Sequence, residues 1–149
     1  MSSSMKLIDE FLALKRIAIV GVSNNGKDFS RTLFREFVTR GYDVVPVNPK
    51  AQEIEGKRSY ANLQQIPEPV EGALLMTPPA VTDVVVRDAV ASGIKRIWMY
   101  RASAEAVAFC RNADIQVVAD ECPFMFLPGG AWFHRFHGTI LKIAGAYPR

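Results

Sequence analysis

Cysteine is scarce in this sequence, since Cys110 and Cys122 are too few for a disulfide framework and lack the spacing of a metal site. A reduced, cytoplasmic setting is the simpler interpretation. The first residues carry little positive charge beyond Lys6, and Asp9 and Glu10 interrupt any apolar segment, so no secretory signal is predicted. Long apolar runs are also missing, and we therefore expect no membrane association.

Charge of one sign does not dominate either. The formal net charge is +3, and the lysines and arginines are scattered along the chain. A nucleic-acid-binding protein would gather such residues on one surface, so nucleic acid is not an expected partner. An anionic small molecule needs only a few local cations. The length of 149 residues, with 49% hydrophobic residues, predicts one soluble domain spanning residues 1–149.

The stretch of residues 16–23 contains the clearest local pattern. Residues 17–20 form a short apolar run, which is typical of a strand buried on both faces, and the run stops at Gly21. Apolar residues then recur at helical spacing from Phe29 to Val38, and Gly41 is expected to end this helix. A strand, a glycine turn and a helix start provide unpaired N–H groups and a positive dipole end, which suit a phosphate.

The rest of the chain alternates between strands and helices. Further strands are predicted at residues 42–47, 72–76, 96–100 and 115–119. The alternation predicts an α/β fold with a doubly wound, Rossmann-like parallel sheet of five strands. Pro46 cannot donate to a sheet, so its strand either lies near an edge or ends early.

The helices are predicted from caps and apolar spacing. Ser4 is expected to cap a leading helix, and Ser103 to cap a later one whose inward residues are Val107, Ala108 and Cys110. A helix from about residue 81 to Gly93 has apolar residues along one face, namely Val81, Val84, Val85, Ala89 and Val90. Residues 56–60 are expected to be irregular, and residues 63–66 to form a short helical turn. An aromatic, helical tail is expected near the C-terminus.

In a doubly wound sheet, ligands bind beyond the carboxyl ends of the strands, where the strand order reverses. The predicted strand exits supply small, hydroxyl and amide side chains, prolines and a few cations. The candidate binding residues are Gly21, Val22, Ser23, Ser30, Arg31, Asn48, Pro49, Lys50, Thr77, Pro78 and Pro79. This set suits the binding of an anion and a sugar better than bond-breaking, so no catalytic residue is assigned.

Two features of a nicotinamide dinucleotide site are missing. A full G-x-G-x-x-G pattern should follow the first strand, but after Gly21 the place of its second glycine is taken by Ser23. An acidic residue should end the second strand, where Asn48 stands instead, and Asp43 lies at the wrong end. An NAD(P)-binding oxidoreductase is therefore a disfavoured alternative. A protein-interaction module that has lost its ligand is a further one.

The sequence resembles the small stand-alone CoA-binding domain proteins, which are similar to the N-terminal domain of the succinyl-CoA synthetase α subunit and of NDP-forming acyl-CoA synthetases. The resemblance rests on an ordered set of segments within about residues 14–123. They are residues 17–23 and 41–49, Gly56 with Tyr60, residues 66–67, Ala89, Gly93, Trp98 and residues 120–123.

The resemblance implies non-catalytic binding of coenzyme A or an acyl-CoA. Gly21, Ser23, Ser30 and Arg31 would then hold the pyrophosphate. Asn48, Pro49 and Lys50 would lie along the adenosine and its 3′-phosphate, with Lys50 as the cation, and Thr77, Pro78 and Pro79 would flank the nucleotide or the pantetheine arm. The related synthetases add a domain with a phosphorylatable histidine and an ATP-grasp partner, which this chain has no room for, so we expect a binding protein rather than an enzyme.

Three further features of the sequence lie outside the candidate binding residues. Cys122 precedes a proline and is interpreted as a packed small apolar residue rather than a nucleophile. His134 and His137 would share a helix face, but a metal site needs a third ligand and a supporting shell, so no metal is predicted. The C-terminal aromatic residues around them are interpreted as packing, or as a contact with another subunit or a partner protein.

Overall fold

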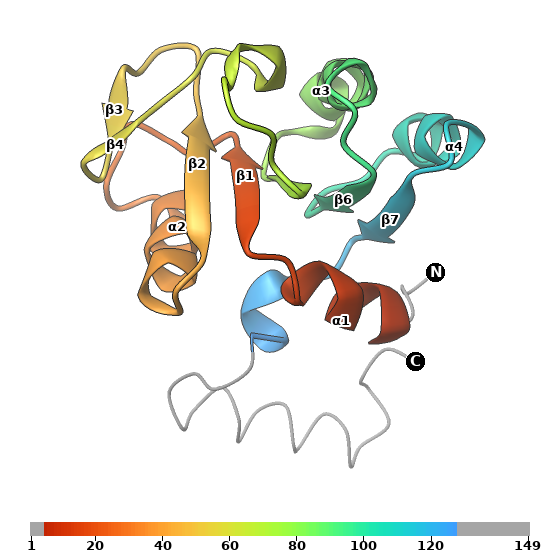
Figure 1. Ribbon diagram of the computed structural model, residues 1–149, viewed down its shortest axis with the longest axis horizontal. Coiled ribbons are helices and arrows are strands. Elements are labelled where there is room, and N and C mark those ends of the chain that lie inside the picture. The colour runs from red at the N-terminus through yellow and green to blue at the C-terminus, as the bar shows by residue number, and fades with distance from the viewer. Residues whose placement is uncertain (1–4, 128–149) are drawn as a thin grey trace.

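The computed structural model of the protein describes residues 5–127 (Figure 1). Its helices are α1 (Met5–Leu12), α2 (Phe29–Thr39), α3 (Pro79–Ala91) and α4 (Ala104–Asn112). The strands of the main sheet are β1 (Arg16–Val20), β2 (Asp43–Val47), β5 (Gly72–Leu75), β6 (Arg96–Met99) and β7 (Gln116–Ala119). The short strands β3 (Glu53–Ile54) and β4 (Lys57–Arg58) pair separately, and η1 (Leu63–Gln65) and η2 (Pro123–Met125) are 3-10 turns.

The five main strands are all parallel and lie in the order β2-β1-β5-β6-β7. The chain passes from β1 to β2 on one side, and then returns to place β5 on the other side of β1. The strand order therefore reverses between β1 and β5, and a ligand crevice is expected at the carboxyl ends of these strands. The predicted five-stranded, doubly wound sheet is confirmed.

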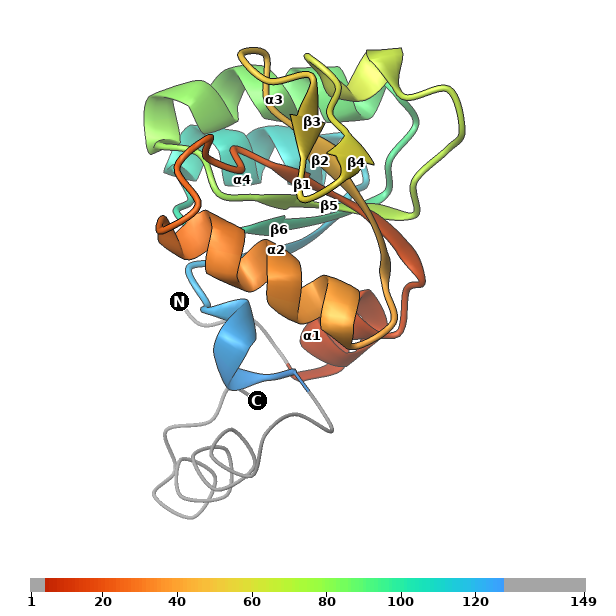
Figure 2. The ribbon, with the colours of Figure 1, turned by 90° about the vertical axis from the view of Figure 1, so that its left-hand side faces the viewer.

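Helices cover both faces of the sheet, with α1 and α2 on one face and α3 and α4 on the other (Figure 2). Alternate residues of β1 supply the two cores, because side chains along a strand point to opposite faces. Ile17 and Ile19 pack on the side of α2, whereas Ala18 and Val20 pack on the side of α3. All four are buried, which is the double-sided burial expected of this apolar run.

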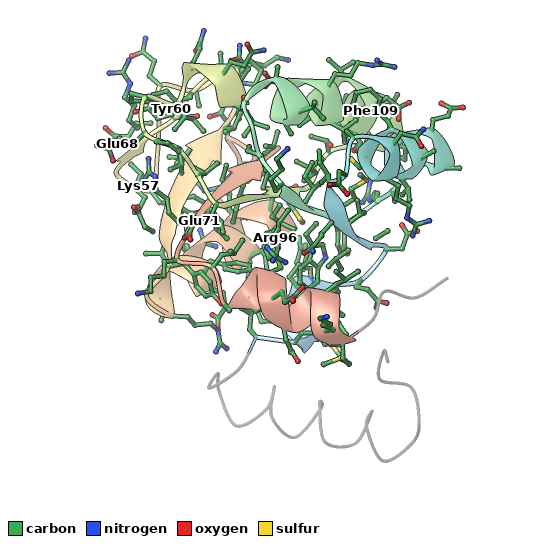
Figure 3. All side chains as sticks on the ribbon, turned by 45° about the vertical axis from the view of Figure 1, so that its right-hand side comes forward. Lys57, Tyr60, Glu68, Glu71, Arg96 and Phe109 are labelled. Carbon is green, nitrogen blue, oxygen red and sulfur yellow. The ribbon has the colours of Figure 1, made fainter. Side chains whose placement is uncertain are left out.

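Pro46 lies on an edge strand, which settles the alternative that the sequence left open. The backbone of β2 continues to Val47, so the strand does not end early. On the outer side of β2, the N–H of Tyr60 donates to the carbonyl of Pro46 at 3.1 Å, and the N–H of Asn48 donates to Tyr60 at 2.9 Å. Tyr60 lies beside the carboxyl end of β2 (Figure 3) and shields this edge.

Some local predictions were wrong. Residues 56–60, expected to be irregular, include strand β4 of a hairpin whose turn places Glu55 at φ +52° and Gly56 at φ +79°. Helix α3 begins at Pro79, two residues before the expected start. In α4, Ala108 is exposed and Ala106 is buried with Cys110, because residues four apart share a helix face.

The predicted Ser103 cap of α4 is confirmed, because Ser103 Oγ accepts a hydrogen bond from the N–H of Ala106 at 3.0 Å.

Other predictions concern residues outside the described part of the chain. Ser4, the expected cap of α1, precedes residue 5, and most of the aromatic tail, with His134 and His137, follows residue 127. Within residues 5–127, no helix is both long enough and apolar enough to cross a bilayer. In the same part of the chain, no three or more histidine, cysteine, aspartate or glutamate side chains lie together so that they could hold a metal ion.

Candidate functional site

A cavity of about 860 Å³ lies where β1 and β2 end, between the loops that follow these strands, η1 and α3. This volume falls within the range of about 300–1,000 Å³ that is usual for small-molecule sites. Most of the sequence-predicted residues line it, namely Gly21, Val22, Ser23, Asn48, Pro49, Lys50 and Thr77. Ser30, Arg31, Pro78 and Pro79 do not line it.

Gly21 makes the turn at the end of β1 and has a φ of +90°, which only glycine adopts readily. A Cβ atom at this position would lie 3.0 Å from Thr77 Cγ2 and 3.1 Å from the carbonyl carbon of Met76. The N–H of Gly21 donates to the carbonyl of Val47 at 3.1 Å. The turn therefore joins the ends of β1, β2 and β5, and any side chain at residue 21 would separate them.

The loop after Gly21 is held by hydrogen bonds from several elements. The N–H of Ser23 donates to Ser30 Oγ at 2.9 Å, and the N–H of Asn25 donates to Ser23 Oγ at 3.0 Å. The N–H of Asn24 has no partner among the described residues, and Asn24 is exposed at the wall of the cavity. An unpaired backbone N–H at such a turn suits a phosphate oxygen. Val22 also lines the cavity, although it is fully buried in the core on the side of α2.

The start of α2 differs from the sequence-based expectation of open N–H groups. The carboxylate of Asp28 caps the helix, accepting from the N–H of Ser30 at 2.9 Å and from Ser30 Oγ at 2.6 Å. The hydroxyl of Ser30 holds the pKa of Asp28 below its usual value. A negative charge thus already occupies this helix end, and the buried Ser30 links the helix to the loop instead of facing the cavity.

Arg31 also faces away from the cavity. Its guanidinium pairs with Glu55, with 2.5 Å between Nη2 and Oε2, and only 14% of its side chain is exposed. Arg31 Nη1 donates to the carbonyls of Ser23 at 3.2 Å and Asn24 at 3.3 Å. This cation therefore bonds the underside of the loop, whereas Ser23 and Asn24 themselves line the cavity.

The loop after β2 is bonded to the loop after β1. Asn48 Nδ2 donates to the carbonyl of Val22 at 2.7 Å, and Asn48 Oδ1 accepts from the N–H of Lys50 at 2.7 Å. Asn24 Nδ2 donates to the carbonyl of Lys50 at 3.3 Å. These bonds leave the ammonium group of Lys50 without an ion pair among the described residues. Lys50 can therefore supply a positive charge at the cavity.

Thr77 and the two prolines that follow it form the stiff entry to α3. Thr77 is buried and bonds to the hydroxyl of Thr82 at 2.6 Å, while it also lines the cavity. Pro78 stands at the N-cap of α3, and Pro79 is its first residue. A proline at this position starts a helix without losing a hydrogen bond. The structure thus gives Pro78 and Pro79 a role in the backbone.

The sequence-based prediction of the site missed the wall that α3 and η1 supply. The residues of this wall are Asn62, Leu63, Gln64, Val81, Val84, Val85, Arg87 and Asp88. Val81 and Val84 are 45% and 67% exposed, although they lie on an apolar helix face. Apolar periodicity was the available signal, but it cannot distinguish a core face from a cavity face. Asp88 Oδ2 accepts from the N–H of Leu63 at 2.7 Å and so holds η1 against α3.

Neither cysteine lines the cavity. Cys110 is fully buried in the core, and burial raises the pKa of its thiol to about 11. Burial also raises the pKa of the Cys122 thiol, against the opposing effect of hydrogen bonds from the N–H groups of Phe124 and Met125. A raised pKa disfavours the thiolate, which is the nucleophilic form.

Comparison with known proteins shows the family and the fold of this chain. The CoA binding domain family matches residues 15–128, which is most of the chain. The chain belongs to this family. A hypothetical protein from Pyrococcus horikoshii OT3 has the same fold, with a TM-score of 0.77, 30% sequence identity and 93% of each chain covered.

Two curated relatives are much longer proteins. The chain is 34% identical over 85 residues to a trans-feruloyl-CoA synthase from an unknown prokaryotic organism, and 26% identical over 92 residues to the α subunit of an ADP-forming acetate–CoA ligase from Pyrococcus furiosus. These matches cover 55% and 61% of this chain, but only 12% and 20% of the relatives. The family is thus related to subunits of acyl-CoA synthetases, of which this chain spans a small part.

Proposed function

We propose that this CoA binding domain protein binds coenzyme A, or an acyl-CoA, in the cavity at the carboxyl ends of β1 and β2, without reacting with it. The observation that carries the proposal is that one cavity combines a glycine turn, an unpaired N–H at Asn24 and an unpaired cation at Lys50. These groups suit a phosphorylated nucleotide. The family match supplies the chemical class of the ligand.

The pyrophosphate would lie at the turn of Gly21, Ser23 and Asn24, where the backbone can approach it closely. The adenosine and its 3′-phosphate would lie along Asn48, Pro49 and Lys50. The apolar wall of α3 offers a surface for the less polar parts of the ligand. Ser30 and Arg31 would support the turn from behind, and Pro78 and Pro79 would hold the entry to α3, in place of the direct contacts expected from the sequence.

The ionisable groups of the cavity support a binding role. Asp88 accepts from the N–H of Leu63 through Oδ2, whereas its buried Oδ1 has no hydrogen-bond partner among the described residues. The guanidinium of Arg87 lies over the ring of Phe109, 4.7 Å from its centre. Lys50 is the lining cation with neither an ion pair nor a ring contact among the described residues, and such a cation can hold an anion. A general acid–base pair would need two groups within hydrogen-bond reach of one reacting atom.

Calorimetric titration of the purified protein with coenzyme A tests the proposal directly. We expect Lys50→Ala to weaken coenzyme A binding by roughly tenfold, because a charge-assisted contact contributes about 1.5 kcal/mol or more. The loss should be smaller with 3′-dephospho-coenzyme A, which lacks the phosphate assigned to Lys50. Lys27→Ala is the matched control, because Lys27 is an exposed lysine of the neighbouring loop that does not line the cavity.

Three outcomes would contradict the proposal. Binding of NAD(H) in the absence of coenzyme A binding would favour the dinucleotide alternative. Binding of neither ligand would favour the interaction module, which a change in oligomer size on deletion of residues 125–149 would support. Equal affinity in Lys50→Ala and the wild type would remove Lys50 from the site.

A further inference from the structure

We propose that Arg31 and Glu55 form a clamp that sets the orientation of the phosphate-binding turn without contacting the ligand. This Arg31–Glu55 clamp joins the first turn of α2 to the β3–β4 hairpin, and it rests on the proposed function only for the identity of the ligand. Its role is that of a positioning device, in which a hairpin outside the main sheet determines how well the cavity binds an anion.

The clamp bonds the carbonyl groups of the loop and not its N–H groups. Arg31 donates to the carbonyls of Ser23 and Asn24, while its Nε and Nη2 donate to Glu55 Oε2 at 3.0 and 2.5 Å. Arg35 reinforces the arrangement, since its Nη1 donates to the same oxygen of Glu55 at 2.8 Å and its Nη2 donates to the carbonyl of Gly26 at 3.2 Å.

Peptide geometry converts these bonds into an orientation for the turn. In a trans peptide the C=O and the following N–H point in opposite directions. Because Arg31 holds the C=O of Ser23 behind the loop, the N–H of Asn24 points to the other side. Ser23 and Asn24 line the cavity and Arg31 does not, so that other side is the cavity. Rotation of this one peptide would replace the N–H donor with a carbonyl oxygen, which repels phosphate.

Glu55 is suited to hold Arg31 in place. It occupies the tight hairpin turn at φ +52°, where the backbone fixes the start of its side chain. Hydrogen bonds from Arg31 hold the pKa of Glu55 below its usual value, so the carboxylate stays charged near neutral pH. With its guanidinium committed to Glu55 and to two carbonyls, Arg31 has little donor capacity left for a ligand.

The variant Glu55→Gln distinguishes positioning from direct contact. If Arg31 positions the turn, Glu55→Gln and Arg31→Lys should each weaken coenzyme A binding by roughly fivefold, since hydrogen bonds that orient the turn are lost. If Arg31 instead contacted the phosphate and Glu55 competed for it, Glu55→Gln would free the arginine and tighten binding. Tighter binding, or unchanged affinity in both variants, would overturn the clamp.

Glu36→Gln is the matched control. Glu36 lies on α2, as Arg31 does, and pairs at 2.8 Å with Arg40, the C-cap residue of this helix. The side chain of Glu36 is 27% exposed, against 26% for Glu55. We expect Glu36→Gln to leave the affinity for coenzyme A unchanged within about twofold, although it replaces a paired glutamate by glutamine just as Glu55→Gln does.

Amide spectra of the free protein separate the clamp from the proposed function. The amide resonance of Asn24 should move in Glu55→Gln and stay in place in Glu36→Gln, with no ligand added. An unmoved Asn24 resonance in Glu55→Gln would overturn the clamp even if coenzyme A binds. A wild-type protein that does not bind coenzyme A, but whose Asn24 resonance responds to Glu55→Gln, would refute the proposed ligand and retain the clamp.

Discussion

At the scale of single residues, Gly21 has the strictest requirement in the site. Its φ is positive, and a Cβ atom at this position would lie too close to Thr77 and to the backbone of Met76. Both features exclude a side chain. Gly26, five residues later in the same loop, has no positive φ and open space around it. The two glycines thus look alike in sequence but have different structural roles.

We predict that Gly21→Ala lowers the free energy of unfolding by about 3 kcal/mol, combining the cost of a left-handed backbone with overpacking against Thr77. Gly26→Ala should change it by no more than about 0.5 kcal/mol. Urea unfolding of both variants measures the difference. Equal effects at the two positions would show that the turn at residue 21 adjusts to a Cβ atom.

Residue identity also limited Pro46 to two positions, an edge strand or a strand end, because a residue without an N–H is confined to these places, and the structure shows the edge strand. The roles of Ser30 and Arg31 could not be predicted in the same way. Both are ordinary polar residues at a helix start, and each could bond either a ligand or the protein. Asp28 and Glu55 are the protein groups that bond them, and Glu55 lies more than twenty positions from Arg31 in the sequence.

At the scale of elements, α3 shows how an apolar helix face can serve a cavity. Its buried residues are Thr82, Val86 and Ala89, which pack toward the sheet. Val81 and Val84 lie on the side that lines the cavity and stay exposed. The helix is therefore apolar on two sides, for two different reasons.

We predict that Val86→Ala lowers the free energy of unfolding by about 2 kcal/mol, because it removes fully buried methyl groups. Val84→Ala should change the same quantity by at most about 0.5 kcal/mol and should weaken coenzyme A binding by roughly two- to fivefold. Urea unfolding and calorimetry on the two variants test this separation. A large loss of stability in Val84→Ala would assign that residue to packing.

At the scale of the whole molecule, carboxylates join segments that are far apart in sequence. Glu71 lies at the end of the sheet opposite to Tyr60 (Figure 3) and accepts from the N–H groups of Lys15 at 2.8 Å and Arg16 at 2.9 Å. Glu55 joins the hairpin to α2 through Arg31. The hydrogen bond from the N–H of Arg16 holds the pKa of Glu71 below its usual value of 4.5, and Arg31 does the same for Glu55.

We predict that the thermal midpoint is nearly constant from about pH 7 to about pH 5 and falls under more acidic conditions. A carboxylate whose pKa is lowered by folding stabilises the protein fully above its ordinary pKa, and this contribution is lost as the pH falls through the folded value. Glu71→Gln should flatten the acid limb, since glutamine can accept the same bonds without binding a proton. The exposed Glu53→Gln is the control, and an equal flattening there would contradict the role of Glu71.

The sequence by itself determined the fold class, the turn at Gly21 and the order of strands and helices along the chain. These features depend on local properties, namely apolar periodicity, the backbone freedom of glycine and the missing N–H of proline. Such properties can be recognised in a short stretch of sequence. The family resemblance likewise depended on short segments read in order.

Only the tertiary structure decided which residues face the cavity. The order of strands in the sheet brings the end of β1 beside the end of β2 and beneath α3, so that valines of α3 and residues of η1 join a site that strand exits alone had predicted. It also turns Ser30 and Arg31 away from the cavity toward Asp28 and Glu55. Side-chain direction depends on partners supplied by other elements, and no local pattern records those partners.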